Sequence, residues 1–282
     1  METQAGVTLA LSGGVGGAKL CLGLAKSLPD AGLHVLVNTG DDFQHLGLHI
    51  CPDIDTLLYT LSGQADADRG WGLEGETWQA MDALEILGGE TWFRLGDRDL
   101  ATHIWRSQQL ANGASLSEVT AHLADRLGVC SKVYPMSDAP VRTTVQTPEG
   151  PLAFQHYFVR DRCEPTVTGF SFEGGSAAQP NRSVLKGLES GLYQRTVICP
   201  SNPFVSIDPI LQIPGLWMAL RSSSAPVVLV SPIVAGRAIK GPAAKMMSEL
   251  GVPVTALGVA EHYCQRYPGL LDYFVIDESD AT

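Results

Sequence analysis

The sequence has few charged residues and no concentrated run of basic ones. Charged residues make up 17% of its 282 residues, and 30 acidic residues outnumber 19 basic ones, which gives a formal net charge of −11. Nucleic acids and anionic membranes attract clusters of Lys and Arg, so the lack of such clusters argues against both as partners. The same net charge repels a phosphate ester, so local backbone donors and a metal ion would have to hold a substrate of that kind.

Paired cysteines and a leader-like segment are also missing. The six cysteines form no C-x-x-C pair, and the first apolar segment is short, interrupted by glycines and preceded by no basic residue. Several cysteines lie in apolar runs, as buried thiols do. We therefore expect a reduced, cytoplasmic location without an export signal or a membrane anchor. The sequence contains no internal repeat and no low-complexity segment.

Residues 38–56 concentrate side chains suited to metal and phosphate chemistry. They follow an apolar run over residues 33–37, which predicts a buried strand, and they contain four carboxylates and two histidines. Carboxylates are costly to bury together, and a divalent cation would remove that cost. Asp41 and Asp42 fall just beyond the carboxyl end of the predicted strand, where open α/β sheets bind their ligands. We therefore predict a divalent metal site at this pair.

The same residues also have a purely structural explanation. Paired aspartates after a strand can form a solvated loop, and Asp53 or Asp55 can cap the helix that begins near them. His45 and His49 have the spacing of zinc-binding helices, but Gly47 lies between them and no helical pattern surrounds them. A zinc site formed by the two histidines is therefore not favoured.

A glycine-rich segment follows the first predicted strand, residues 7–11, and leads into a helix predicted from about Ala18 to Leu28. Glycines let backbone N–H groups approach an anion, and a helix N-terminus adds a positive dipole, so we expect phosphate binding here. The segment matches neither the P-loop nor the dinucleotide fingerprint, and a tight turn packed against the sheet is the alternative. The residues expected to bind the nucleotide or its phosphates are Gly13, Gly14, Val15, Gly16, Gly17 and Lys19.

Residues 200–207 follow another predicted strand and supply a second set of polar groups. Two prolines stiffen this loop, and its Ser and Asn side chains offer hydrogen bonds suited to a base or a sugar. The residues expected to take part in nucleotide binding are Ser201, Asn202, Pro203 and Ser206. Residues 92–99 carry Arg94 beside aromatic side chains at a predicted helix start. Salt bridges with an Asp97 or Asp99 N-cap are one interpretation, and an arginine clamp on a ring or a phosphate is the other.

Apolar segments alternate with helical patterns along the chain, which predicts an α/β fold. Residues 65–190, with β-rich segments over 141–147, 151–159 and 166–172, read as an insertion of helices and a β-hairpin. We therefore predict one domain over residues 1–282, with a Rossmann-like, doubly wound, mostly parallel sheet. The strands predicted for the sheet include residues 7–11, 33–37, 196–199 and 227–230, a strand near Val254, and residues 273–276.

Together these segments resemble the CofD family of 2-phospho-L-lactate transferases. The most specific feature is the string Asn-Thr-Gly-Asp-Asp…Pro-Asp-Ile-Asp-Thr within residues 38–56, whereas the glycine loop alone would identify no family. The resemblance covers almost the whole chain. Its matching segments are residues 12–19, 38–56, 92–99, 200–207, 231–234 and 240–242.

The resemblance implies a transferase of coenzyme F-420 biosynthesis. Such an enzyme moves a phospho-acid, which is lactyl, enolpyruvyl or glyceryl, from a guanosine diphosphate ester to the ribityl hydroxyl of the deazaflavin Fo and releases GMP. It also implies Mg²⁺, a homodimer, and a guanylyltransferase as the supplier of the unstable substrate. The choice among the three acids stays open at the level of sequence.

The resemblance also implies roles for single residues. By analogy Asp55 and Arg94 would bind Fo, and Asp41 and Asp42 would bind the metal. Asp55 and Asp42 would be the catalytic carboxylates, and the identity of the general base stays open. Asn38 and Thr39 would contact the nucleotide, whose guanosine part would lie near residues 200–207. The alternative function is a non-catalytic, nucleotide-sugar-binding regulator that resembles the CofD-like gluconeogenesis factors.

Overall fold

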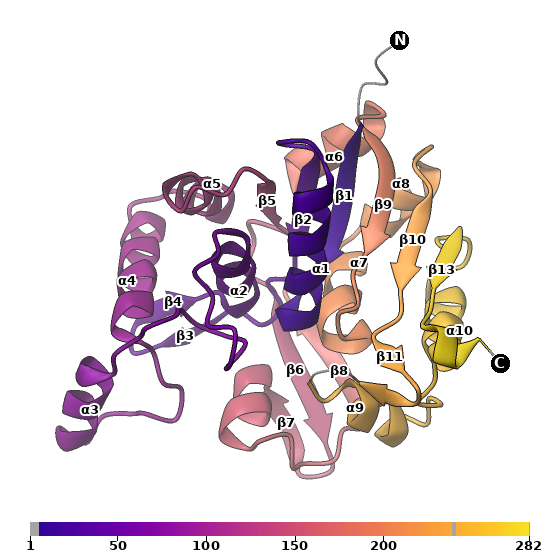
Figure 1. The fold of residues 1–282 in the computed structure, drawn as a ribbon. Helices are drawn as coiled ribbons and strands as arrows, with labels where there is room; N and C mark the ends of the chain where they lie inside the picture. Colours follow the sequence, from indigo (N-terminus) through magenta and orange to yellow (C-terminus); the bar gives the residue numbers. More distant parts are fainter. Residues whose placement is uncertain (1–5, 239–240, 282) are drawn as a thin grey trace.

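The computed structural model describes residues 6–238 and 241–281, so Lys240 of the family motif at residues 240–242 lies outside the described residues. Its centre is a six-stranded parallel sheet with the strand order β13-β10-β9-β1-β2-β5 (Figure 1). Read from β5, the strands follow the doubly wound order in which the first and fourth strands are neighbours. The predicted doubly wound, parallel sheet is confirmed. The strands are β1 (Val7–Ser12), β2 (Leu33–Val37), β5 (Lys132–Pro135), β9 (Tyr193–Ile198), β10 (Val227–Val230) and β13 (Tyr273–Val275).

The central strands are apolar because both faces of the sheet are covered. Side chains alternate between the faces of a strand, and accordingly Leu9 and Leu11 of β1 enter one hydrophobic cluster while Ala10 enters another. Such burial explains the near-continuous apolar runs in the sequence. The helices that supply buried residues to the cluster with Ala10 are α1 (Gly14–Ser27), α2 (Pro52–Leu61) and α5 (Leu116–Arg126). The helices that supply the cluster with Leu9 and Leu11 include α6 (Arg182–Glu189), α8 (Leu216–Ser222) and α10 (Ala256–Arg266).

Residues 65–190 do not form one uninterrupted insertion, because β5 pairs in parallel with β2 inside the central sheet. The segment supplies an antiparallel sheet of β6 (Arg142–Thr147), β7 (Gly150–Ala153) and β8 (Gly169–Glu173). The predicted strand over residues 151–159 is too long, because a π-helical turn, His156–Arg160, replaces its second half. The assignment of residues 1–282 to a single domain stays a prediction.

A second extension carries the hairpin β3 (Phe43–His45) and β4 (Leu48–Ile50), followed along the chain by α3 (Gln79–Ile86) and α4 (Asp97–Ala111). Figure 1 shows α3 and α4 at the side of the molecule remote from β13. The short elements α7 (Asp208–Leu211), α9 (Ala243–Glu249), β11 (Ile233–Val234) and β12 (Arg237–Ala238) lie nearer the C-terminus. The predicted strand near Val254 is wrong, because this residue lies in the irregular segment that leads into α10.

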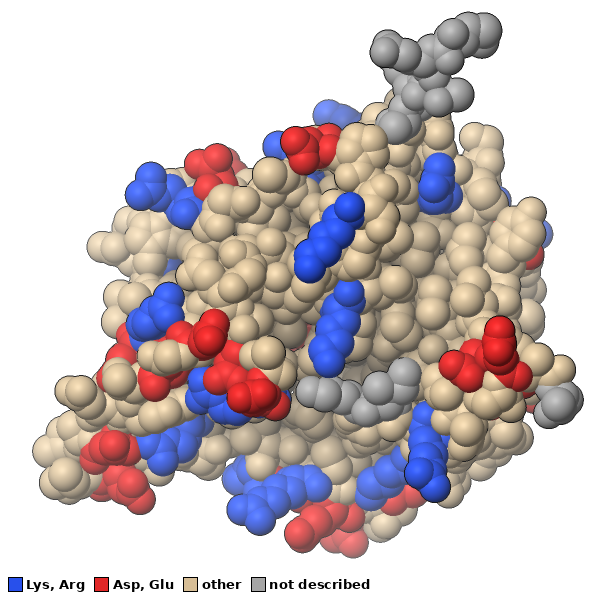
Figure 2. Space-filling model, viewed as in Figure 1, with Lys and Arg blue, Asp and Glu red and all other residues tan. Residues whose placement is uncertain are grey.

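Acidic and basic side chains are interspersed over the face drawn in Figure 2, and two basic side chains stand over α1, which contains Lys19 and Lys26. This face shows no broad basic surface of the kind that binds nucleic acid. Within the part of the chain that the structure describes, no single helix combines the length and apolar composition of a membrane span. One bent pair, residues 203–211 with residues 216–222, meets that test jointly across a bend of 79°.

Candidate active site

The two predicted nucleotide loops meet where β1 and β9 end side by side. The hydroxyl of Ser201 accepts a hydrogen bond from the backbone N–H of Gly13 at 3.1 Å and donates one to its carbonyl at 2.7 Å. Since β1 and β9 are the first and fourth strands of the sheet, this is the switch point at which doubly wound proteins bind ligands. Both segments follow predicted strands of the sheet, and the structure places them side by side.

The glycine segment is not a loop but mainly the first turn of α1, which begins at Gly14 rather than near Ala18. Close packing accounts for its composition. A Cβ atom at Gly16 would lie 2.7 Å from the carbonyl oxygen of Pro200, and one at Gly17 would overlap the hydroxyls of Ser12 and Ser201. Gly14 has a φ of +65°, which other residues rarely adopt. The packing alternative is thus well supported, and phosphate binding by these N–H groups stays a prediction.

The loop after β9 uses its polar side chains internally. Asn202 accepts a hydrogen bond from the backbone N–H of Phe204 at 3.0 Å, and its amide lies 3.2 Å from the sulfur of Met246. Ser201, Pro203 and Ser206 are buried. These contacts fix the shape of the loop at the switch point. The predicted contact of this loop with guanosine is not tested by them.

Asp53 lies at the N-terminus of α1, a position that sequence reasoning did not assign to it. Its Oδ1 accepts a hydrogen bond from the backbone N–H of Gly14 at 2.7 Å, and its Oδ2 accepts one from Asn38 at 2.9 Å. It does not cap its own helix α2, whose N-cap is Cys51. Burial, only partly offset by the hydrogen bonds from Asn38 and Gly14, raises the pKa of Asp53 to about 6. This carboxyl group therefore exchanges its proton near neutral pH.

Asp41 and Asp42 are buried at the end of β2, and one oxygen of each, Oδ1, has no hydrogen-bond partner within the described chain. Nearby, the hydroxyl of Thr39 is also buried without a partner. Burial and the neighbouring carboxylate of Asp53 raise the pKa of Asp41 well above its ordinary value. Unpartnered carboxylate oxygens are costly in a protein interior and are the donors that Mg²⁺ prefers. The pair therefore fits a hard divalent cation.

Asp55 lies on α2 and forms a buried ion pair with Arg106 of α4. Both terminal nitrogens of the guanidinium donate to the carboxylate, one of them at 3.0 Å. Burial raises the pKa of Asp55, and the charges of Arg106 and His103 oppose that rise. The imidazole of His103 also lies 3.2 Å from the carboxylate of Asp99. Asp55 is thus held in one orientation by groups that the sequence interpretation had not included.

The spacing of charged residues in α4 could have predicted this ionic network around Asp55. Asp99, His103 and Arg106 are spaced by four and three residues, which places them on one face of a helix. That face is directed inward, because His103 is 1% exposed and Arg106 is fully buried. Charged residues with helical spacing on an apolar face indicate a buried ionic network.

Arg94 lies away from these groups. Its guanidinium is exposed, pairs with Asp82 of α3 at 2.5 Å, and lies 5.3 Å from the ring centre of Trp78. The charged partners of Asp55 are instead Arg106 and His103. The structure therefore does not bring the two predicted Fo ligands into contact, and their shared role stays a prediction.

Asp97 and Glu76 cap the two helices of this extension reciprocally. Asp97 accepts hydrogen bonds from the first N–H groups of α3 rather than of its own helix α4. Glu76 accepts the N–H groups of Arg98 and Asp99 at the start of α4. The predicted N-cap by Asp97 or Asp99 is therefore wrong, because Gly96 holds that position without a side-chain cap.

An aromatic cluster borders the acidic segment. His45 of β3 lies 5.2 Å from Trp92 and 5.8 Å from Phe93, measured between ring centres, and His156 lies 4.8 Å from Trp92. Burial lowers the pKa of His45. As the sequence indicated, His45 does not lie on a helix; the structure places it on the β3–β4 hairpin.

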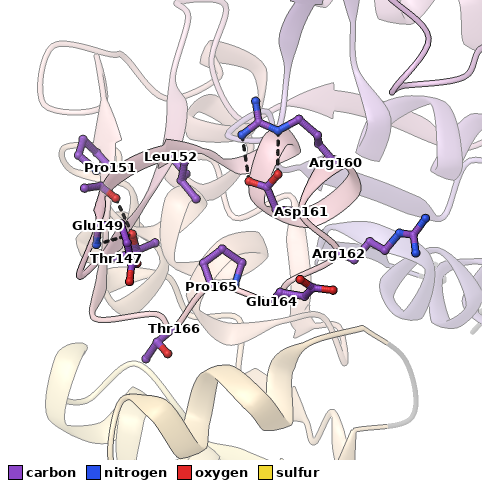
Figure 3. A pocket seen from close by; sticks show the side chains of 11 residues that line it. Thr147, Glu149, Pro151, Leu152, Arg160, Asp161, Arg162, Glu164, Pro165 and Thr166 are labelled. Carbon is purple, nitrogen blue, oxygen red and sulfur yellow. Dashed lines mark hydrogen bonds and ion pairs between the residues drawn. The ribbon is translucent and has the colours of Figure 1, made fainter.

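A large open hollow of about 800 Å³ lies between the β6–β7 hairpin and residues 160–166 (Figure 3). Arg160 and Asp161 face each other there through two hydrogen bonds, and Arg162 and Glu164 lie below them in the view. None of its lining residues belongs to the predicted site. The acidic residues at the switch point, not this hollow, carry the chemistry that the sequence predicts.

Comparison with known proteins agrees with the resemblance seen in the sequence. The profile of the family described as "2-phospho-L-lactate transferase CofD" matches residues 8–282. A 2-phospho-L-lactate transferase of Methanosarcina mazei is 42% identical over 271 residues, which are 96% of this chain and 87% of that protein. A phosphoenolpyruvate transferase of Nocardia farcinica is 41% identical over 281 residues, covering 96% of this chain and 84% of the relative.

A solved structure, protein BH3568 from Bacillus halodurans, has the same fold. It superposes with a TM-score of 0.67 over 99% of this chain and 82% of its own, at 16% sequence identity. At that identity the likeness concerns the fold alone, whereas the relatives above 40% identity are transferases. The regulator alternative therefore has less support than the enzyme. The match over residues 8–282 and these relatives show that the chain belongs to the CofD family, the 2-phospho-L-lactate transferases.

Proposed function

We propose that this transferase joins the phospho-acid part of a guanosine diphosphate ester to the ribityl hydroxyl of Fo and releases GMP. The reaction would be a step in the biosynthesis of coenzyme F-420. Support comes from relatives that are at least 41% identical over 96% of the chain and are named 2-phospho-L-lactate transferase or phosphoenolpyruvate transferase. The acceptor Fo and the leaving group GMP are part of the proposal.

The observation that carries the proposal is the position of Asp41 and Asp42. Their buried, unpartnered oxygens lie at the carboxyl end of β2, beside the switch point that the ends of β1 and β9 form. A diphosphate bound there would meet the N-terminus of α1, whose dipole favours anions. It would need a cation between its own oxygens and the two carboxylates.

Mg²⁺ is the cation proposed for this place, with Asp41 and Asp42 as the protein groups that would hold it. When bound, it would offset the negative charge of the diphosphate and of the departing GMP. The fit rests on the chemistry of the donors, which are carboxylate oxygens without another partner. GMP is a good leaving group, so alignment and charge compensation contribute more than a strong general acid would.

Two aspartates compete for the role of the base that accepts the hydroxyl proton of Fo. Asp55 is oriented by Arg106, and a carboxylate held in this way can position a hydroxyl group. Asp53 has a pKa of about 6, which suits proton transfer near neutral pH, and it lies nearer the glycine segment. We propose Asp55 as the base, with Asp53 as the alternative.

The proposal also covers the oligomeric state, the location and the partner of the enzyme. We propose a homodimer, a cytoplasmic location, and a guanylyltransferase that supplies the unstable ester, as the family resemblance implies. All six cysteines lie in the described chain and carry free thiols. Size measurement in solution by light scattering tests the dimer directly, since a molecule of 30.1 kDa would refute it.

The decisive experiment supplies Fo with each of three guanylylated acids, namely phospholactate, phosphoenolpyruvate and phosphoglycerate. Mass spectrometry of the products shows both whether Fo is extended and which acid is preferred. The relatives' names include both lactyl and enolpyruvyl chemistry, so both substrates must be tested. We expect one of the three to give an Fo adduct and an equal amount of GMP. No adduct with any of them, at saturating Mg²⁺, would refute the proposal.

A further inference from the structure

The hairpin of β3 and β4 brings three different metal-binding side chains together. Its register pairs Phe43 with Ile50 and Gln44 with His49. The next position along the hairpin therefore sets Asp42 opposite Cys51. Residues two apart on a strand share a face, as do residues directly opposite each other, so Asp42, His49 and Cys51 all point the same way.

The distances between these side chains are those of a metal-binding group. The thiol of Cys51 lies 3.1 Å from Oδ2 of Asp42, and Nε2 of His49 lies 3.5 Å from the same oxygen. All three donor atoms lie within 4.8 Å of one another. A tetrahedral ion with bonds of about 2.0–2.3 Å needs donors roughly 3.3–3.8 Å apart, so small side-chain adjustments suffice.

Among the described residues, one carboxylate oxygen of Asp42 and one ring nitrogen of His49 have no hydrogen-bond partner. Oδ1 of Asp42 and Nε2 of His49 are both buried, and the Asp42 side chain is only 1% exposed. The other ring nitrogen of His49 lies 3.1 Å from the amide of Gln44. Such a contact fixes the ring orientation, as outer partners do for metal-binding histidines.

We propose that Asp42, His49 and Cys51 form a binding site for a thiophilic divalent cation such as Zn²⁺. Mg²⁺ prefers oxygen donors, whereas Zn²⁺ accepts a carboxylate, an imidazole and a thiolate together and often leaves a fourth position to water or substrate. Binding replaces the S–H bond of Cys51 by a metal–sulfur bond, and the proton passes to the solvent. Affinity therefore rises with pH.

The other group of metal-binding side chains, Asp55, Asp99 and His103, does not suit a cation in the same way. The guanidinium of Arg106 donates to Asp55 and lies 3.2 Å from Nδ1 of His103. A positive charge thus already occupies the centre of that group. Within the described residues no Lys or Arg side chain forms an ion pair with Asp42, and Arg106 reaches only the backbone carbonyl of His49, at 3.4 Å.

Asp42 belongs both to this site and to the proposed Mg²⁺ site, so zinc binding would affect the enzyme. A zinc ion held by Asp42 competes with the Mg²⁺ that we assign to Asp41 and Asp42. This consequence rests on the proposed function, but the binding site itself does not. The site is therefore tested without substrate, so that its failure and the failure of the proposed function are distinguishable.

The test uses Co²⁺ as a spectroscopic substitute for Zn²⁺ on the reduced, full-length protein. We expect near-ultraviolet absorption from sulfur-to-cobalt charge transfer, displaced by a stoichiometric amount of Zn²⁺ but by Mg²⁺ only at a large excess. Cys51→Ser should abolish that absorption, and the matched variants of exposed thiols, Cys130→Ser and Cys264→Ser, should retain it. Its absence from the unmodified protein, or its persistence in Cys51→Ser, would overturn the proposal.

A second variant covers the case in which Cys51→Ser does not fold. His49→Gln alters a side chain that is 16% exposed, and the variant His122→Gln changes an exposed histidine on α5 as its control. We expect cobalt affinity to fall at least about tenfold in the first variant, the lower bound typical even of outer partners, and to stay unchanged in the second. Equal affinities in the two variants would also overturn the proposal.

Discussion

Arg106 and Asp55 form a two-pronged ion pair in which the guanidinium is fully buried and the aspartate is 5% exposed. The pair joins α4 to the start of α2, and α2 packs against the central sheet. The planar guanidinium matches the two carboxylate oxygens and so fixes the orientation of Asp55. Arg106 of α4 thereby determines the direction in which Asp55, the proposed catalytic carboxylate, points.

Removal of Arg106 should destabilise the protein strongly. Arg106→Met leaves Asp55 buried without its counter-charge, and loss of one partner from such a pair typically costs about 3–5 kcal/mol. Urea denaturation followed by circular dichroism measures the change. The control is Arg160→Met, which breaks a solvent-exposed pair with Asp161 and should cost far less stability. Similar losses in the two variants would contradict the importance assigned to burial.

The glycines of α1 should differ sharply in their tolerance of alanine. Gly16→Ala places a methyl group 2.7 Å from the rigid carbonyl oxygen of Pro200, so it should reduce stability and shift the two loops apart. Gly23 lies in the same helix with no atom within 4 Å of its missing Cβ, and Gly23→Ala should stabilise by roughly 0.5–1 kcal/mol. Thermal unfolding of both variants measures the difference, and equal effects would show that the close packing is not limiting.

Local patterns in the sequence predicted local structure well, and long-range pairings less well. The strands over residues 33–37 and 227–230 have the predicted bounds, because apolar runs between turn residues specify buried strands. Ser115 and Glu118 form a capping box, another feature that a short local pattern specifies. Pairing of β5 with β2 could not be read, since the partner of a strand is set by contacts distant in sequence.

The site shows the same division between local and distant information. The ends of β1 and β9 meet because the topology of doubly wound sheets makes the first and fourth strands neighbours. The hydrogen bonds from Gly14 and Asn38 to Asp53 depend on where α2 lies against α1, which no local pattern encodes. Arg106 was missed although the spacing of Asp99, His103 and Arg106 on one helical face carried the signal.

Stability should decrease between about pH 4 and pH 6 because of Asp53. Its pKa rises from an ordinary value of 3.8 to about 6 on folding, so the folded state binds the proton more tightly in this range. The unfolded state binds fewer protons there, so the free energy of unfolding falls as the pH rises, by on the order of 3 kcal/mol in total. The raised pKa of Asp41 acts in the same direction.

Urea denaturation at a series of pH values tests this linkage. Asp53→Asn cannot titrate and should flatten the decrease between pH 4 and pH 6, whatever its effect on absolute stability. Asp66→Asn serves as the control and should leave that decrease in place, because hydrogen bonds from Arg69 lower the pKa of this partly buried carboxylate. An unchanged slope in Asp53→Asn would show that this carboxyl group is not the one responsible.

Arg94 should bind Fo only after it leaves Asp82. In the free chain its guanidinium pairs with this aspartate and lies against Trp78. Arg94→Ala should weaken Fo binding, because a guanidinium can stack on a planar ring or donate hydrogen bonds to it. Asp82→Ala removes the competing partner and should preserve or strengthen binding. Quenching of Fo fluorescence measures both affinities, and unaltered affinity in Arg94→Ala would exclude the proposed contact.

The response to Mg²⁺ should distinguish the metal-binding carboxylates from the base. Asparagine keeps the size of aspartate but loses its charge. Asp41→Asn and Asp42→Asn should therefore need more Mg²⁺ for half-maximal rate, and added Mg²⁺ should restore part of the activity. Asp55→Asn should lose roughly 10²–10⁴-fold in rate with an unchanged Mg²⁺ requirement, as loss of a positioned base does.

Asp53→Asn decides between the two candidate bases. If Asp53 accepts the proton, its variant should show the large loss of rate and should also lose the dependence of rate on a group with a pKa of about 6. If Asp55 does so, Asp53→Asn should show only a modest loss of rate, and the pH dependence of its rate should match that of the unmodified enzyme. Arg106→Lys adds an independent check on Asp55, because it retains the positive charge but not the two-pronged contact that orients the carboxylate. If Arg106→Lys has a rate as low as that of Asp55→Asn and keeps the wild-type Mg²⁺ affinity, the orientation of Asp55 is essential for catalysis. Rescue of Asp55→Asn by Mg²⁺ would instead assign Asp55 to the metal site.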